Sequence, residues 1–375
     1  MTRASFKFPV RLAVGALMVL LSGCLGSDGG DGWRQPPIEQ TDADHPHHHD
    51  RDAAPSPEPT IADAGPVSLD ADGSDLGNVP AALVTVVVLP DTQYYSSSHP
   101  DIFAAQTRWI VEQQAARNIA VALHVGDLVD TDNTAQWTVA NSSMRALDGL
   151  VPYLLVPGNH DSDANRVSLI DNYFAPATMP WITGTMTAGQ IENNYALVDI
   201  GPQKWLILGI EFGPRDAVLT WADTVLKTYP TLPAIIVTHA YLYGDVRYDF
   251  ATYGTSQAYY PRFYGFTPTE GINDGEDIWQ KLIVPNPNVR LVFCGHLSAP
   301  GRLTSLRADG SPVHQILSDY QWLYANTPDD LGGSGYLRTL QFDYRKREIR
   351  VQTYSPYLDT FLTDDGNQFT VSLEL

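Results

Sequence analysis

Cysteine is nearly absent from this chain of 375 residues, which contains only Cys24 and Cys294. The two lie in unlike contexts, so we do not expect a disulfide between them, and a scaffold held together by disulfides is excluded. A structural zinc site rich in thiolates is excluded for the same reason. Cys294 ends the apolar run 291–294 and is expected to be a buried core thiol.

Two motifs of other enzyme classes are also missing from the sequence. It contains no Gly-x-Ser-x-Gly segment, so the strained turn that exposes the nucleophile of many serine hydrolases is not indicated. It contains no Gly-x-x-x-x-Gly-Lys loop either, so work driven by nucleotide hydrolysis is not indicated.

Basic residues are few, with 23 lysines and arginines against 43 aspartates and glutamates and a formal net charge of −20. An acidic protein gains little from contact with a phosphate backbone, so nucleic acid is not expected as a partner. The charge is unevenly distributed. Residues 1–24 carry three basic residues and no acids, whereas residues 25–80 carry twelve acids and two arginines. The length allows one large domain or two ordinary ones, and nothing indicates the oligomeric state.

Residues 1–24 are predicted to be a secretory signal peptide, because a basic beginning is followed by the short apolar stretch 12–21. That stretch is too short to span a bilayer comfortably. It ends in Leu-Ser-Gly-Cys, which resembles the bacterial lipobox. The resemblance implies that Cys24 is acylated and anchors a secreted lipoprotein to a membrane. Leu25 follows where inner-membrane retention usually requires Asp, which favours the outer membrane or cell surface, with the periplasmic side also open. The alternative is an ordinary signal peptide with an incidental cysteine.

Residues 25–80 are rich in Asp, Pro, Gly and His and show no apolar periodicity, which predicts a disordered acidic linker between the lipid and the folded part. The linker contains a cluster of four histidines, for which weak or incidental metal binding is expected. These are His45, His47, His48 and His49.

From residue 81 onward, strand-like and helix-like patterns alternate, which predicts one α/β domain over 81–375 with central sheets and outer helices. The predicted strands are 83–89, 119–125, 151–156, 194–200, 205–212, 234–237, 289–293, 313–317, 336–344 and 348–354. The predicted helices are 102–117, 135–150 and 216–229. Gly201-Pro202 predicts a hairpin turn. Residues 241–275, rich in Tyr and Gly, are expected to form a long functional loop that could offer an aromatic wall to a substrate.

Metal-ligand side chains follow five of these apolar strands, where each strand is expected to end. In an open α/β sheet, ligands bind beyond the carboxyl ends of the strands, so the five groups could converge on one cleft. Asp, Asn, Gln and His together suit borderline or hard divalent cations. Glycines precede three of the groups and are expected to permit the tight turns. The groups are Asp91 and Gln93, Asp127, Asn159 with His160 and Asp161, His239, and His296. His124, inside a strand, is expected to be a core residue.

Together these segments resemble the calcineurin-like metallophosphoesterases, over residues 84–300. The resemblance implies a four-layer α/β/β/α sandwich with two divalent metal ions, among which Mn, Fe, Zn and Mg are open. Asp127 would bridge the two ions. The other ligands would be Asp91 and Gln93 for the first ion, and Asn159, His239 and His296 for the second.

The resemblance also implies hydrolysis of a phosphomonoester or phosphodiester by a metal-activated hydroxide, with a phosphorylated small molecule or a phosphodiester as substrate. His160 would not bind metal. It would protonate the leaving oxygen or stabilise charge, and Asp161 would orient it. Asp130 would accept a hydrogen bond beside the ligands. Arg215 could reach a phosphate, with a cap or salt bridge as the other interpretation.

Two positions depart from the family pattern and both affect the first metal ion. Gln93 stands where the family usually has His, and Ser298 stands where its last motif has a second His. Amide and hydroxyl oxygens are poorer ligands than imidazole, so weaker binding or a preference for Mn or Mg is expected. Asp-Thr-Gln at the first motif is associated with a recognisable branch of the family. Asp319-Tyr320-Gln321 ends a late strand and could add a contact at the rim.

Two alternatives come from other classes of protein. One is a catalytically impaired surface-binding lipoprotein that retains the metallophosphoesterase fold, supported by the departures at Gln93 and Ser298. The other is a structural lipoprotein that uses metal for stability only. The complete ligand set of the second ion and the placed acid His160 argue against the first, because binding alone requires no such acid. Structural metal sites tend to be closed and rich in thiolates, which argues against the second.

Overall fold

The computed structural model describes residues 83–267, 271–324, 327 and 330–375. The chain divides into two units, Met1–Val67 and Ser68–Leu375, and the first lies wholly outside the described residues. The predicted signal peptide, the lipidation site Cys24 and the predicted linker with its histidine cluster therefore remain sequence predictions. Within the described residues, no helix combines the length and the apolar character needed to cross a bilayer.

The first of two seven-stranded sheets has the order β15-β14-β13-β1-β2-β3, with β16 also paired to β14. Its strands are β1 (Val84–Leu89), β2 (Ile119–His124), β3 (Tyr153–Leu155), β13 (Leu337–Asp343), β14 (Glu348–Ser355), β15 (Thr360–Leu362) and β16 (Phe369–Ser372). The pairs β1–β2 and β2–β3 are parallel, so these three strands end at the same edge. All six residues of β1 are buried, as expected for a strand covered on both faces.

The second sheet has the order β11-β12-β10-β7-β6-β5-β4. Its strands are β4 (Gly184–Thr185), β5 (Asn194–Ile200), β6 (Gln203–Gly209), β7 (Ala234–Val237), β10 (Val289–Cys294), β11 (Pro300–Leu306) and β12 (Pro312–Ser318). The neighbours β6, β7, β10 and β12 are parallel, so they too end at one edge. The predicted hairpin is confirmed, because Ile200 pairs with Gln203 across the turn at Gly201-Pro202.

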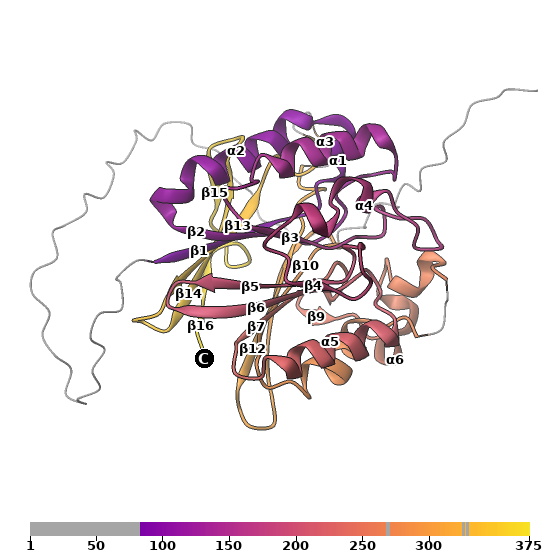
Figure 1. Ribbon diagram of the computed structural model, residues 1–375, viewed down its shortest axis with the longest axis vertical. Coiled ribbons are helices and arrows are strands. Elements are labelled where there is room, and N and C mark those ends of the chain that lie inside the picture. Colours follow the sequence, from indigo (N-terminus) through magenta and orange to yellow (C-terminus); the bar gives the residue numbers. More distant parts are fainter. Residues whose placement is uncertain (1–82, 268–270, 325–326, 328–329) are drawn as a thin grey trace, which may run out of the picture. The chain divides into compact units, whose positions relative to one another are not determined.

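Three apolar cores separate four layers. One core lies between the sheets and includes Val86, Ile207 and Phe293. A second joins the first sheet to α1 (Gln93–Ser98), α2 (Pro100–Arg117) and α3 (Thr134–Arg145). The third joins the second sheet to α5 (Asp216–Thr228), α7 (Gly275–Ile278) and the π-helix η4 (Trp279–Ile283). Figure 1 shows α2 and α3 on one side of the sheets and α5 on the other. The predicted α/β/β/α sandwich is therefore confirmed.

The helix boundaries follow local chemistry. Pro100 stands in the first turn of α2, where its missing N–H costs nothing, and α2 ends at Asn118 in the left-handed conformation, with φ of 49°. Asn133 caps α3 by accepting a hydrogen bond from the Gln136 backbone N–H. The prediction of a helix to residue 150 was too long, because α3 ends at Arg145 and irregular turns follow it.

The segment expected to be a long loop, 241–275, is more structured than its sequence indicates. It contains β8 (Leu242–Tyr243), β9 (Val246–Arg247), α6 (Phe250–Tyr253), η2 (Gly254–Ser256) and η3 (Pro261–Tyr264). Tyr241, Tyr248 and Tyr260 are fully buried, and Tyr248 and Tyr260 pack with Phe212 and Phe266 in a small core. These three rings therefore serve as interior packing, and the predicted aromatic wall for a substrate stays a prediction for the half-buried Tyr243.

The remaining short elements connect the two sheets. They are α4 (Ile170–Tyr173) and η1 (Pro176–Thr178). Strands β4, β8, β9, β11, β15 and β16 were not predicted. Burial alternates along β11, but its residue types do not follow that alternation, because the strand includes Pro300, Gly301 and the exposed Leu306, and this obscures the strand signal.

Candidate metal centre

Three buried side chains from three strand ends form the centre of the site. Asp91 follows β1, Asp127 follows β2 and His239 follows β7, and one ligand atom of each lies within 4.8 Å of the others. β1 and β2 belong to the first sheet and β7 to the second. The group therefore lies where the carboxyl ends of both sets of parallel strands meet, as expected for an open α/β sheet.

The orientation of His239 is set by its Nδ1, which lies 2.9 Å from the Val125 carbonyl oxygen. A carbonyl only accepts, so Nδ1 carries a hydrogen, and Nε2 of the neutral ring has a free lone pair. Nε2 lies 3.1 Å from Asn159 Oδ1, 3.2 Å from Asp127 Oδ2 and 4.0 Å from Asp91 Oδ2. Four electron-rich atoms thus converge, and a proton or a metal cation is needed among them. This donor set fits a divalent cation.

Two further predicted ligands each have a buried atom with a lone pair that accepts no hydrogen bond within the described residues. His296 Nε2 lies 2.7 Å from the Tyr259 carbonyl oxygen and so donates to it, which leaves the lone pair on Nδ1. Nδ1 is buried and has no hydrogen-bond partner among the described residues. Gln93 Oε1, at the beginning of α1, is likewise buried and without a partner in the described chain. Buried polar atoms are rarely left unpaired, so these two also fit a metal ligand set.

The backbone around the site is strained and tightly packed. Asp127 and His296 adopt positive φ angles of 50° and 76°, which are uncommon for residues other than glycine and cluster at functional sites. The glycines before two ligands are needed for close approach. A Cβ on Gly158 would lie 2.0 Å from Asp127 Oδ1, and one on Gly295 would lie 2.1 Å from Asp91 Oδ1. Glycine is therefore required at these two positions because a side chain would not fit, and not because the backbone has a positive φ.

Electrostatics at the site are dominated by buried carboxylates. Burial raises the pKa of Asp91 well above its usual value, and the charges of Asp319 and Asp127 raise it further. Burial alone would also raise the pKa of Asp127, but attraction to His239 and His160 outweighs it and lowers the pKa. Burial alone would lower the pKa of His239, and the Asp127 carboxylate reverses this and raises it. Such a group of charges is stabilised by a bound cation.

His160 is anchored beside this group through two contacts. Its backbone N–H donates to Asp127 Oδ1 at 2.9 Å, and its ring Nδ1 donates to the Asp130 carbonyl oxygen at 2.9 Å. The Asp130 carboxylate lies farther off, with Oδ1 3.8 Å from Nδ1. The imidazole therefore has its Nε2 free. Asp130 supports His160 chiefly through its main chain.

The predicted role of Asp161 in orienting His160 is wrong. Within the described residues its carboxylate makes no hydrogen bond to the imidazole and instead accepts three backbone N–H groups, from Leu128 at 3.1 Å, Val129 at 2.9 Å and Gly158 at 2.8 Å. Asp161 is fully buried and ties the loop after β2 to the loop after β3. Because those loops carry Asp127 and Asn159, Asp161 positions predicted ligands.

Replacing Asp161 with asparagine is expected to destabilise the fold by about 1–3 kcal/mol, because an amide nitrogen would face a buried backbone donor and leave it unsatisfied. Thermal or urea unfolding of the metal-free protein measures this. Asp163→Asn is the matched control, since Asp163 also accepts two backbone N–H groups but in an exposed loop. Equal stability losses in the two variants would contradict the positioning role of Asp161.

His124 behaves as expected for a core residue. It is fully buried, Gly126 N–H donates to its Nδ1, and its Nε2 lies 3.0 Å from Thr92 Oγ1. Burial lowers its pKa to about 3. Both ring nitrogens are occupied, so none remains for a metal.

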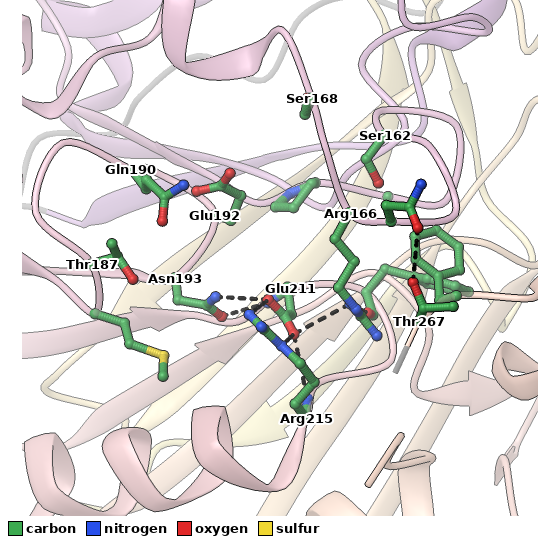
Figure 2. A pocket seen from close by; sticks show the side chains of 16 residues that line it. Ser162, Arg166, Ser168, Thr187, Gln190, Glu192, Asn193, Glu211, Arg215 and Thr267 are labelled. Atoms are coloured by element: carbon green, nitrogen blue, oxygen red, sulfur yellow. Dashed lines mark hydrogen bonds and ion pairs between the residues drawn. The ribbon is translucent and has the colours of Figure 1, made fainter. Parts of the chain in front are cut away.

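A cavity of about 270 Å³ has Gly158 and Ser162 on its wall, and although Gly158 precedes the predicted ligand Asn159, none of the predicted ligands lines the cavity. Its charged wall is built around Glu211, which is nearly buried (Figure 2). Arg215 Nε lies 2.7 Å and Arg166 Nη1 3.2 Å from Glu211 Oε1. Arg215 therefore takes the salt-bridge role. Burial raises the pKa of Glu192, also on this wall, to about 7. Two guanidinium groups thus pair with one carboxylate on this wall.

Two groups near the predicted first metal ion were understood incompletely from the sequence. Ser298 Oγ accepts a hydrogen bond from the Trp322 backbone N–H at 2.8 Å. Asp319, expected at the rim, is fully buried directly after β12, and burial raises its pKa to about 7. The pattern of an apolar strand ending in a ligand residue also applies to β12 and could have placed Asp319 in the cluster.

A family model described as calcineurin-like phosphoesterase matches residues 84–300. The match covers more than half of the chain, and the fold and the buried Asp91, Asp127 and His239 group agree with it. The chain therefore belongs to the calcineurin-like phosphoesterase family. Sequence comparison identifies YvnB of Bacillus subtilis (strain 168) as 33% identical over 312 residues, covering 78% of this chain and 22% of YvnB. The chain thus spans about a fifth of the length of that relative.

Two solved structures are similar to the chain. GAP50, described as the anchor in the inner membrane complex of Plasmodium, is 13% identical with a TM-score of 0.43, over 78% of this chain and 89% of GAP50. SoxB, a sulfate thiohydrolase of Thermus thermophilus in complex with glycerol, is 9% identical with a TM-score of 0.41, over 76% of this chain and 58% of SoxB.

Proposed function

We propose that this protein hydrolyses phosphate esters with two divalent metal ions bound at the candidate centre. The observation that carries the proposal is the convergence of His239 Nε2 with oxygens of Asp127, Asn159 and Asp91. Asp127 would bridge the ions. Asp91 and Gln93 would bind the first ion, and Asn159, His239 and His296 would bind the second.

Bound ions of this kind polarise phosphoryl oxygens and lower the pKa of a water molecule. The protein's own residues do the rest. Asp161 fixes the two ligand-bearing loops, and Val125 fixes the tautomer of His239. His160 donates its Nδ1 hydrogen to the Asp130 carbonyl oxygen, and as an imidazolium it would give the second hydrogen, on Nε2, to the leaving oxygen and become neutral. No serine or cysteine nucleophile is needed.

The cavity around Glu211 suggests where the rest of the substrate lies. It adjoins Gly158, next to the predicted ligand Asn159, and its wall carries Arg166 and Arg215, both paired with Glu211. We propose that the part of the ester beyond the reacting phosphate binds there, in a phosphorylated small molecule or a phosphodiester. Polar groups that can hydrogen-bond to this wall suit it best.

The test is hydrolysis of p-nitrophenyl phosphate and bis-p-nitrophenyl phosphate by the purified full chain, with Mn²⁺, Zn²⁺ or EDTA. Activity that requires metal and is lost with EDTA supports the proposal, and the preferred ester separates a monoesterase from a diesterase. A folded protein without activity under any metal would instead favour a binding protein that retains the fold.

We also propose that Cys24 anchors the protein to the outer membrane or cell surface, on the strength of the sequence Leu21-Ser22-Gly23-Cys24. Replacing Cys24 with serine removes the acylated thiol and is expected to move the protein from the membrane fraction to the soluble fraction. Fractionation followed by immunoblotting measures this. A Cys24→Ser protein that remains in the membrane fraction would refute the anchor.

A further inference from the structure

The sequence of β12 brings a third acid to the edge where the predicted ligands lie. β12 runs parallel to β10, with Leu317 opposite Cys294. Asp319 therefore leaves β12 at the same edge at which His296 leaves β10. The His296 backbone N–H in turn lies 3.0 Å from Asp91 Oδ2. The ends of β1, β10 and β12 are thus brought together around Asp91.

Three acceptor oxygens in this region have no donor. Asp319 Oδ1 accepts the Gln321 backbone N–H at 2.9 Å, but Asp319 Oδ2 has no hydrogen-bond partner among the described residues. The same is true of Gln321 Oε1 and Gln93 Oε1. All three side chains are at most 3% exposed. Buried acceptors are rarely left unpaired in native proteins, so three such atoms together indicate a ligand that takes electron pairs.

Two hydrogen bonds of Trp322 place the segment that carries Asp319 and Gln321 beside Ser298 and Gln93, the two positions that depart from the family pattern. The Trp322 backbone N–H donates to Ser298 Oγ at 2.8 Å, at the position of the missing second histidine. The Trp322 indole hydrogen-bonds the Tyr94 hydroxyl, and Tyr94 follows Gln93. The segment 319–322 therefore lies between Ser298 and the beginning of α1.

The charges of the region agree with a cation. Asp91, Asp127 and Asp319 are all buried, and within the described residues no lysine or arginine forms an ion pair with any of them. His239 is their single basic ion-pair partner in that part of the chain, and it contacts only Asp91 and Asp127. Buried carboxylates require a pairing charge or a bound metal.

We infer that Asp319 is the carboxylate ligand that replaces the family's second histidine at the first metal ion, with Gln321 as an additional oxygen donor. This inference rests on the proposed dinuclear centre. The first ion would then be bound by Asp91, Gln93, Asp127 and Asp319 through oxygen alone. Oxygen ligands select hard cations, so this site takes Mn²⁺ or Mg²⁺ in preference to Zn²⁺. The second ion, with two histidines, keeps a borderline ligand set.

The test measures Mn²⁺ binding to the full chain by calorimetry and metal analysis, independently of activity. Wild type is expected to bind two Mn²⁺, and Asp319→Asn to bind one, with the remaining affinity unchanged. Asp309→Asn is the matched control, because Asp309 lies in the exposed turn between β11 and β12 and bonds only locally to Ser311. It should bind two.

The melting temperature distinguishes a metal-ligand role of Asp319 from a purely structural one. If Asp319 is a ligand, Asp319→Asn removes a buried charge near Asp91, so the metal-free variant should be as stable as wild type or more stable, and the rise in its melting temperature on adding Mn²⁺ should be smaller. A structural residue would instead lower the melting temperature of the metal-free protein. Circular dichroism at increasing temperature measures both quantities.

A second variant addresses ligand replacement directly. Adding Ser298→His to Asp319→Asn should restore the second equivalent of metal and allow Zn²⁺ to occupy it. Two Mn²⁺ bound by Asp319→Asn with unchanged affinity would overturn the inference and leave the proposed function intact. Wild type that binds no metal, or a single ion, would overturn the proposed dinuclear centre and the inference with it.

Discussion

Replacing His239 with alanine is expected to remove metal-dependent hydrolysis, with a fall in turnover of roughly 10³-fold or more. His239 Nε2 is the atom at which oxygens of Asp127, Asn159 and Asp91 converge. Without the ring, the second ion loses a nitrogen ligand, and the three oxygens are left facing each other. Turnover of the preferred p-nitrophenyl ester and bound metal measured on the same sample give the result.

Folding should change much less than activity in that variant. The ring makes one hydrogen bond outside the cluster, to the Val125 carbonyl oxygen, and its loss costs on the order of 1 kcal/mol. His314→Ala is the matched control. His314 is also nearly buried and hydrogen-bonded, to Thr304 and Ser372, but it lies near the beginning of β12, away from the strand ends. Full metal content and turnover in His239→Ala would show that the centre lies elsewhere.

The sequence predicts much of the fold because its apolar runs are short and clearly bounded. β1, β5, β7 and α5 lie within one or two residues of their predicted ranges, since each has an uninterrupted apolar or amphipathic pattern. The edge strand β11 was missed, because its exposed residues carry little pattern. The segment 241–275 was predicted least well, since the burial of Tyr248 and Tyr260 includes packing with Phe212, which is distant in the sequence.

The sequence also predicts one part of the candidate site and not the other. Which residues stand at strand ends is local, and Asp91, Asp127 and His239 are indeed brought together. Which atoms face each other is not local. The carboxylate of Asp161 stands next to His160 in the chain, yet it bonds to the loop after β2, 32 residues away at Val129. Asp319 reaches the same sheet edge as His296 because β12 pairs in parallel with β10.

His160 offers the clearest separation of chemistry from metal binding. Within the described residues its ring hydrogen-bonds to the Asp130 carbonyl oxygen and to none of the predicted ligands of the second ion. The His160 backbone N–H donates to the Asp127 carboxylate. His160→Ala should therefore keep its metal and lower turnover by roughly 10²–10⁴-fold, the usual contribution of a general acid. His239→Ala loses both properties, so the two variants form a matched pair.

The dependence on the leaving group decides whether His160 acts as an acid. A p-nitrophenolate leaves with little help, whereas an alkoxide requires a proton as its bond to phosphorus breaks. The loss in His160→Ala should therefore be larger for alkyl phosphate esters than for p-nitrophenyl esters. Turnover of a series of esters with leaving groups of increasing pKa gives the slope, which should steepen in the variant. An equal loss across the series would assign His160 to charge stabilisation, and loss of metal would show that His160 is a ligand after all.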